Sequence, residues 1–507
     1  MNAIFMALQS ILRRMTTHIE IGHDLRDKKT PIAVPLRMMN RHGMIAGSTG
    51  TGKTRSLQLL AEGLARAGVP VFLADVKGDL AGMCLPGEAS ERLVARAATV
   101  GRTFTPEAFP VDFFSLTGAR GIQLRATISS FGPVLLGKVL DLTDVQQSVL
   151  AMVFKYCDDR RMPLLDFDDL RGVLTYLSNE GKEELKQYGG MSSATVGVLV
   201  RKMVELEQQG AAKFFGEPEL DIHDLLRTVD GKGVVNILSL ADVQDKPRLY
   251  STFLMWLLGQ FYYRMPEVGD PDKPKLVFFF DEAHQLFADA SSALVEHIEQ
   301  IARLIRSKGI GVFFITQTPK DVDEDVLAQL GNRIQHAFRV FTAKDAKNLK
   351  AIASTFPITK EVDVASALTN LGIGEAVVTV LDEKGIPTPV VPAQIIAPSS
   401  SMSAIDDAQY GRVIAASPIA PKYATSINRE SAHEMLQKKL EQSVETREEV
   451  SEESQKDEFE WRQQTPRRRG RARQSAVERT VQTVARQATR TLTQQVVRGI
   501  FGMLKGR

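Results

Sequence analysis

The chain has 507 residues, of which 43% are hydrophobic and 24% charged, a composition that is ordinary for a soluble globular protein of about two to four domains. Two cysteines, Cys84 and Cys157, exclude a disulfide framework and suit a reducing compartment, so we expect a cytoplasmic protein. The net charge of +2 conceals a basic C-terminal region, and no apolar run approaches the ~20 residues of a membrane-spanning helix.

The first residues, 1–14, are apolar and end in Arg13 and Arg14. Because a secretory signal carries its positive charge before the apolar stretch, this order favours a short helix or an upstream extension of a chain that starts at Met15. The whole stretch 1–40 predicts a small lead-in that is rich in strands.

A phosphate loop follows at Gly47–Thr54, whose sequence GSTGTGKT has the full G-x-x-x-x-G-K-[ST] pattern. A short buried strand over 43–46 precedes it and a helical pattern over 56–64 follows, which is the context that the motif requires. Glycines let backbone N–H groups turn inward around phosphate oxygens, and the helix adds its positive N-terminus. The alternative, a glycine-rich turn that happens to contain Lys-Thr, does not account for this context.

We expect Lys53 to reach the β- and γ-phosphates of a nucleoside triphosphate and the Thr54 hydroxyl to ligate Mg²⁺. The residues predicted to bind the nucleotide are consecutive in the sequence: Gly47, Ser48, Thr49, Gly50, Thr51, Gly52, Lys53, Thr54 and Arg55.

Further buried strands are predicted over 69–74 and 111–115, which indicates an α/β sheet. The sequence DVKGDL at 75–80 puts polar groups at the end of the first of these strands, where a ligand crevice opens. Apolar residues recur at helical spacing over 133–227, and we interpret this segment as a helical subdomain inserted into the sheet domain. The sheet resumes at 233–240, followed by a core-facing helix around 249–263.

The apolar run of 276–280 ends in Asp281 and Glu282, as expected for the strand that partners a phosphate loop. Asp281 is predicted to hold Mg²⁺ and Glu282 to orient and activate the attacking water. The plainer alternative is a buried strand followed by an acidic turn.

Three polar residues near later strands are further candidates. Gln317 ends the predicted strand 310–317, where it is either a sensor of the γ-phosphate or merely solvated. Arg333 and Arg339 lie on a strand over 332–340; each is either an arginine supplied to a neighbouring subunit or a surface side chain. Residues 375–392 predict a closing hairpin around the turn 382–385.

Beyond residue 396 the apolar signal fades, and we predict a charged, partly disordered linker over 397–475. An arginine-rich stretch at 467–473 precedes an amphipathic helix over 476–507. Such a helix contacts nucleic acid, a membrane surface or a protein partner, and its Ala, Thr and Val content favours docking to a protein.

In this order, the segments GSTGTGKT, DVKGDLAG, FFFDEAH, RLIRSKGIGVFFITQTP and LGNRIQHAFR resemble the HerA-like helicases, and most of all a bacterial family of uncharacterised ATPases. The resemblance covers about residues 20–395 and places the chain with the HerA–FtsK superfamily. The string DEAH at 281–284 does not indicate a DEAH-box helicase. Such a helicase needs two tandem RecA-like domains, and we expect the sequence after His284 to complete only one sheet.

The resemblance implies a RecA-like core over 41–132 and 228–396 that binds ATP and Mg²⁺ and assembles as a hexamer. It assigns Lys53 and Thr54 to the phosphate-loop pair, Gln317 to the sensor, and Arg333, or else Arg339, to the arginine finger. HerA itself carries a β-barrel before its phosphate loop, so the nuclease docking associated with that barrel is not implied here.

Two hypotheses follow. One is a ring-forming, Mg²⁺-dependent ATPase that translocates DNA, and the other is an ATP-driven switch or assembly factor that acts on a protein through the C-terminal helix. Stimulation of ATP hydrolysis by DNA distinguishes them.

Overall fold

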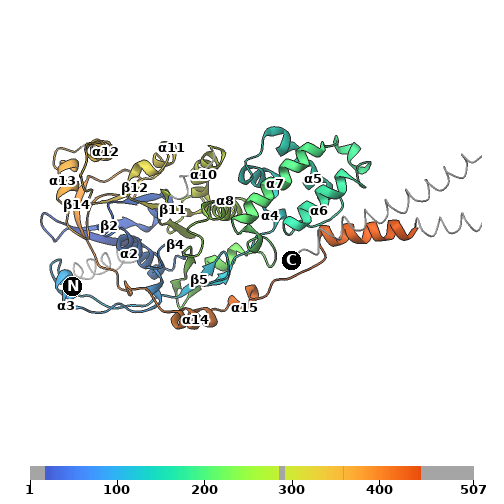
Figure 1. Ribbon diagram of the computed structural model, residues 1–507. Coiled ribbons are helices and arrows are strands. Elements are labelled where there is room, and N and C mark those ends of the chain that lie inside the picture. Colours follow the sequence, from blue (N-terminus) through green and yellow to red (C-terminus); the bar gives the residue numbers. More distant parts are fainter. Residues whose placement is uncertain (1–16, 285–291, 358, 447–507) are drawn as a thin grey trace, which may run out of the picture. The chain divides into compact units, whose positions relative to one another are not determined.

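The computed structural model describes residues 17–284, 292–357 and 359–446 (Figure 1). Two compact units divide the chain, Met1–Gln437 and Lys438–Arg507. The predicted helices over 1–14 and 476–507, like the linker beyond residue 446, lie outside the described residues. No helix in the described ranges is long and apolar enough to cross a bilayer.

A sheet of 12 strands in the order β2-β1-β14-β13-β12-β3-β11-β10-β4-β9-β5-β6 forms the core of the first unit, and its run from β12 to β6 is parallel. Every residue of β3, β4, β10 and β11 is buried, as their apolar sequences predict for strands covered on both faces. The predicted α/β class with a mostly parallel sheet is therefore confirmed. The parallel strands are β3 (Gly43–Ala46), β4 (Val71–Asp75), β5 (Val111–Ser115), β6 (Ile122–Gln123), β9 (Val235–Ser239), β10 (Leu276–Phe280), β11 (Ile310–Thr316) and β12 (Asn332–His336).

The other edge of the sheet is antiparallel. Strands β13 (Glu375–Thr379) and β14 (Val391–Ile395) form the predicted hairpin, which the lead-in strands β1 (His18–Asp24) and β2 (Pro31–Pro35) extend. The second hairpin strand was expected over 388–391 and is assigned as Val391–Ile395, although the Thr388 amide already donates to the Val380 carbonyl at 2.8 Å.

Helices cover both faces of the sheet (Figure 1). On one face, α2 (Lys53–Arg66) contributes Leu57, Leu60 and Leu64 to a core that includes Phe279 of β10. On the other, α8 (Pro247–Arg264) contacts β10 through Phe261 and Phe278, whose ring centroids are 5.3 Å apart. Alternate residues of one strand thus pack against opposite helical layers.

The segment between β6 and β9 is dominated by helices, as predicted for the insertion. Phe131, Phe214 and Trp256 pack together there, and the Trp256 indole donates to the Ser130 hydroxyl at 2.9 Å, which ties this segment to α8. Its division into a separate subdomain stays a prediction. The main helices are α4 (Ile128–Val139), α5 (Asp144–Asp159), α6 (Phe167–Ser178) and α7 (Ser193–Gln208), and β7 (Thr228–Val229) pairs with β8 (Lys232–Gly233) before β9.

Residues 398–423 were expected to begin a charged linker, and the structure differs there. The buried Glu62 carboxylate of α2 accepts hydrogen bonds from the Ser399 and Ser400 amides at 2.7 and 2.8 Å. Tyr410, on α14 (Asp407–Ala416), packs on Phe113 with ring centroids 4.5 Å apart. A serine-rich segment of low hydropathy is therefore held to the core by hydrogen bonds, which apolar periodicity does not report.

The remaining helices are α3 (Glu91–Ala98), α10 (Ser292–Ile305), which packs on α8, α11 (Glu324–Leu327), α12 (Ala343–Ala353), α13 (Val364–Asn370) and α15 (Ala420–Tyr423).

The central strand β10 gives a test of the packing. Phe279 is fully buried and stacks on Phe313 with centroids 5.2 Å apart, so Phe279→Ala should lower the free energy of unfolding by about 3–5 kcal/mol through lost burial and a cavity. Urea denaturation measures this change. Phe341 is 87% exposed, and Phe341→Ala should change the free energy by less than about 0.5 kcal/mol; equal losses in both variants would contradict the assignment.

Candidate nucleotide-binding site

The phosphate loop connects the carboxyl end of β3 to the first turn of α2. Gly47 and Gly52 have φ values of 152° and 121°, which L side chains rarely adopt. A Cβ on Gly47 would meet the Cβ of His336 at 2.6 Å, and a Cβ on Gly52 would meet Gly374 at 3.3 Å. The loop is therefore packed closely against the ends of β12 and the β13 approach.

Lys53 is the first residue of α2 and is buried. Its Nζ donates to the carbonyl oxygens of Gly47 and Ser48 at 2.8 and 3.2 Å, and burial lowers the pKa of this ammonium. Thr54 follows in the same turn. Arg55 points elsewhere, because its guanidinium donates to Gln58 and to the Met402 carbonyl.

Asp281 and Glu282 follow β10, which is separated from β3 only by β11. Both are buried, and Glu282 has a φ of 48°, a strained value for a residue with a side chain. Burial, together with the charge of Glu282, raises the pKa of Asp281 to about 7. Asp281 Oδ1 accepts from the Glu282 amide at 2.9 Å, whereas Oδ2 has no hydrogen-bond partner among the described residues.

This unpartnered oxygen is the observation that fits Mg²⁺. A buried carboxylate oxygen of Asp281 and a hydroxyl of Thr54 are oxygen donors, which Mg²⁺ prefers, and Mg²⁺ usually keeps several waters beside such ligands. The residues present therefore fit the predicted metal.

A second lysine, Lys77, lies beside the carboxylates and is a site residue that the sequence reasoning missed. It follows β4, the neighbour of β10, and its Nζ forms an ion pair with Glu282 Oε1. The polar sequence after β4 indicated a possible site there, but nothing in the local sequence indicates which residue the Lys77 ammonium contacts. His284 Nδ1 lies 3.4 Å from the other oxygen of Glu282.

Gln317 is exposed at the end of β11, between the phosphate loop and the carboxylates. Thr316 is in register with Ala46 of β3, and the Ala283 amide donates to the Ile315 carbonyl at 2.8 Å. One edge of the sheet thus brings together the phosphate loop, Asp281, Glu282 and Gln317, although they are spread over more than half of the chain.

The two candidate arginines occupy different positions. Arg333 is in register with Met44, before the carboxyl edge, and its guanidinium donates to the carbonyls of Leu327, Leu330 and Thr355.

Arg339 lies at the edge itself. Its amide donates to the Ser48 hydroxyl at 3.1 Å, and its guanidinium donates to the carbonyls of Thr369 and Leu371 at 3.2 Å each. Because both guanidinium groups are bonded within their own chain, an action in a neighbouring subunit stays a prediction for each.

His336, at the end of β12, packs against the phosphate loop, and the sequence analysis did not predict it as a site residue. Its Nδ1 lies 2.9 Å from the Glu375 carbonyl and its Nε2 lies 2.8 Å from the Ser56 hydroxyl of α2. Burial lowers its pKa to about 4, so the ring is neutral, and a proton on Nδ1 leaves Nε2 to accept from Ser56. This link ties the first turn of α2 to the sheet.

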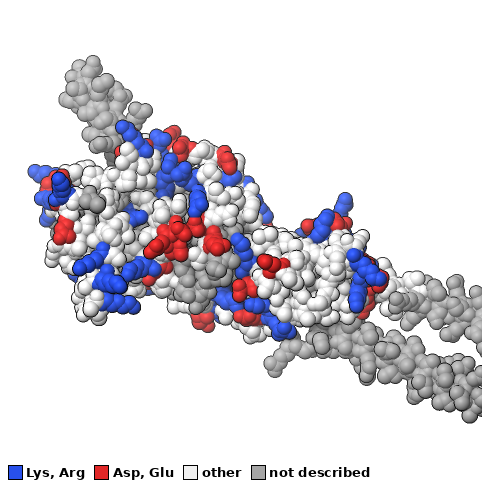
Figure 2. Space-filling model, turned by 90° about the horizontal axis from the view of Figure 1, so that it is seen from above, with Lys and Arg blue, Asp and Glu red and all other residues white. Residues whose placement is uncertain are grey.

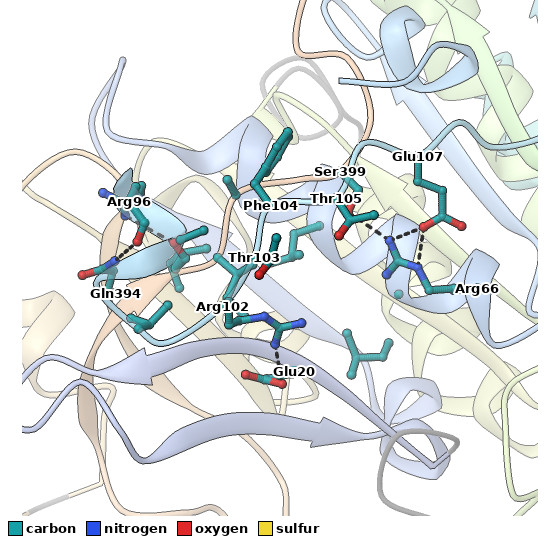
Figure 3. Close-up of a pocket in the computed structure, with 18 of the residues that line it drawn as sticks. Glu20, Arg66, Arg96, Arg102, Thr103, Phe104, Thr105, Glu107, Gln394 and Ser399 are labelled. Carbon is teal, nitrogen blue, oxygen red and sulfur yellow. Dashed lines mark hydrogen bonds and ion pairs between the residues drawn. The ribbon is translucent and has the colours of Figure 1, made fainter. Parts of the chain in front are cut away.

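A cavity of about 550 Å³ lies elsewhere, along the second half of α2 (Figure 3). Its cations are matched by carboxylates: Arg66 pairs with Glu107 at 2.8 Å, and Arg102 pairs with Glu20 at 2.5 Å. No residue of the phosphate loop lines it. Arg96 and Ile395 connect the two regions, because both donate to the Gly374 carbonyl and the Gly374 amide donates to the Thr51 carbonyl.

The raised pKa of Asp281 generates a prediction on stability. The carboxyl has a pKa of about 7 in the folded chain against an ordinary value of 3.8, so its contribution to stability is present below about pH 4 and lost as the pH rises through 7. Asp281→Asn should therefore raise the melting temperature at pH 8, without nucleotide or metal, and change it little at pH 4. Thermal unfolding at both pH values measures the melting temperature, with Asp325→Asn at an exposed position as the control. An equal rise in melting temperature at both pH values would contradict the electrostatic explanation.

Comparison with known proteins agrees with this geometry. The family described as "Helicase HerA-like C-terminal" matches residues 20–507. The DNA double-strand break repair helicase HerA of Saccharolobus solfataricus is 23% identical over 368 residues, 71% of this chain and 65% of that protein. The HerA of Sulfolobus acidocaldarius is 20% identical over 362 residues, 68% of this chain and 64% of that protein, so the chain spans slightly less than two thirds of either relative.

Among solved structures, the plasmid coupling protein TrwB in complex with a non-hydrolysable GTP analogue is 14% identical, with a TM-score of 0.49 and coverage of 78% of this chain and 95% of TrwB. The family match over nearly the whole chain confirms the resemblance seen in the motifs. The chain therefore belongs to the HerA-like helicase family of P-loop ATPases.

Proposed function

We propose that this protein is a Mg²⁺-dependent ATPase that assembles as a ring and translocates DNA. The observation that carries the proposal is the meeting of Lys53, Asp281 and Glu282 on one edge of the sheet, where β3, β11 and β10 end side by side.

The chemistry of hydrolysis follows from the roles of these groups. The backbone N–H groups of the phosphate loop and the N-terminus of α2 bind the phosphates, with Lys53 on the β- and γ-phosphates. Thr54 and Asp281 would hold Mg²⁺, which supplies positive charge against the phosphate oxygens. Gln317 orients the attacking water, and the Glu282 carboxylate accepts its proton.

An exposed apolar surface beside the phosphate loop supports assembly into a ring. Phe341 is 87% and Ile373 63% exposed, and both lie in segments that bond the loop, through the Arg339 amide to Ser48 and the Gly374 amide to Thr51. Large apolar side chains in such positions favour burial by another protein surface. A second copy of this chain, carrying Arg333 or Arg339 to the site, is the occupant that we propose.

The choice of DNA as cargo is supported by the named relatives, which are DNA repair helicases, and by the surface charge. Figure 2 shows one large group of acidic side chains near the middle of this face, smaller acidic groups elsewhere, and basic side chains in several separate groups. Exposed lysines follow one another at intervals of three on α12 (Lys344, Lys347 and Lys350), and Lys320 bonds Asn348 of the same helix. Such a row suits phosphate contacts that read no sequence.

We assign this motor to the cytoplasm on the basis of its cysteines. Neither Cys84 nor Cys157 forms a disulfide, which suits a reducing compartment.

The assignment of catalytic roles predicts two different defects. Lys53→Ala should abolish nucleotide binding, whereas Glu282→Gln should bind nucleotide as the wild type does and lose about 10²–10⁴-fold in kcat, the usual contribution of a general base. Phosphate release measures the rate, and a fluorescent ATP analogue measures binding. If Glu282→Gln hydrolyses ATP at the wild-type rate, Glu282 is not the base.

The choice of cargo predicts a response to DNA. Double-stranded DNA at low salt should raise the ATPase rate of the wild type, and this stimulation should fall steeply with salt because phosphate contacts release counterions. Replacing Lys344, Lys347 and Lys350 together by Gln should weaken the stimulation and leave the rate without DNA unchanged. A wild type that neither single- nor double-stranded DNA stimulates would favour the alternative, an ATP-driven switch or assembly factor that acts on a protein.

A further inference from the structure

We propose that Lys77 is a positioning residue that holds the Glu282 carboxylate in an idle ion pair, and that phosphate groups of the cargo release it. The proposal rests on the proposed function, because it explains how a DNA-dependent ATPase remains slow without DNA.

The ion pair joins two groups of very different exposure. Glu282 is buried, with 7% of its side chain exposed, whereas 49% of the Lys77 side chain is exposed. The ammonium can therefore leave into solvent, while the carboxylate cannot follow it. Only a movement of Lys77 opens the pair.

The backbone that carries Lys77 is fixed. The Asp75 carboxylate accepts from the amides of Lys77, Gly78 and Leu80 at 2.7–3.2 Å, and Gln244 donates to the Val76 carbonyl at 2.6 Å. Opening of the ion pair therefore needs a rotation of the lysine side chain and no rearrangement of the loop.

Lys77 is the lysine in contact with the carboxylates in this state. The other lysine of the site, Lys53, donates to the carbonyls of Gly47 and Ser48. His284 lies 3.4 Å from Glu282, and the nearby acids Asp79 and Asp281 add negative charge that attracts Lys77. The charge distribution thus favours the closed pair.

The closed pair works against catalysis. A general base must lie within hydrogen-bond reach of the attacking water, and the Lys77 ammonium occupies Oε1 of the Glu282 carboxylate. The pair also fixes the direction of the carboxylate. A phosphate polymer arriving at this edge of the sheet competes for the exposed ammonium, since phosphate is a strong partner for lysine.

The test compares Lys77→Gln with the wild type, in the full chain, with and without double-stranded DNA. We expect the kcat of Lys77→Gln without DNA to rise about two- to fivefold, the range expected of a partly exposed ion pair, with unchanged nucleotide affinity. Addition of DNA should then raise its rate little further. Lys77→Arg keeps the charge and should keep the slow rate.

Lys155→Gln is the matched control, because Lys155 is an exposed lysine in an ion pair with Asp159 and does not contact Glu282. It should leave the rate without DNA as in the wild type. Lys77→Met, which keeps the aliphatic stem, replaces Lys77→Gln if the latter does not fold.

Three results are decisive. A kcat of Lys77→Gln at or below that of the wild type would overturn the proposal and make Lys77 a group that assists hydrolysis. A raised rate in a protein whose wild type ignores DNA would support the restraint and refute DNA as the cargo. A raised rate together with lost DNA stimulation supports both.

Discussion

The burial of the central parallel strands on both faces is the constraint on which the rest of this structure depends. Every residue of β3, β10 and β11 is buried between two layers of helices, so a polar side chain has room only where a strand ends. The chain places its phosphate loop, its two carboxylates and its glutamine at these ends. Groups that are far apart in sequence meet there because parallel strands bring all their carboxyl ends to one edge.

The charges at that edge of the sheet destabilise the folded chain when no ligand is bound. Two adjacent carboxylates are buried, Glu282 has a strained backbone, and an oxygen of Asp281 has no hydrogen-bond partner among the described residues. Lys77, which follows β4, pairs with Glu282, and Lys53, at the start of α2, interacts electrostatically with both carboxylates. Strain and unpaired charge of this kind collect at functional sites, where ligands relieve them.

The phosphate loop in turn depends on contacts outside the motif. His336 joins the first turn of α2 to the hairpin edge, and Gly374 approaches Gly52 too closely to admit larger side chains. Further along α2, the buried Glu62 binds the serine segment that follows the sheet. The helix that begins at the nucleotide site is therefore held along much of its length.

Local pattern alone predicted the strands and the motif residues well. Residues 111–115 form a strand with the predicted bounds, and the apolar runs before Gly47 and Asp281 are β3 and β10. A run of apolar residues between polar ends is local information, because it depends on burial and on little else. The segment 398–423 was misjudged for the complementary reason, since hydrogen bonds to Glu62 leave no apolar period in the sequence.

The sequence by itself determined which residues are apolar, which strands they form and where the phosphate-loop motif lies. The tertiary structure decided which polar groups meet: Lys77 reaches Glu282 across 205 positions, and Ser56 reaches His336 across 280. Such contacts depend on the order of strands in the sheet, which hydrophobic periodicity does not encode. Hydrophobic periodicity indicates that a strand is buried on both faces. Only the tertiary structure shows which helices cover the strand and which polar groups lie beside its end.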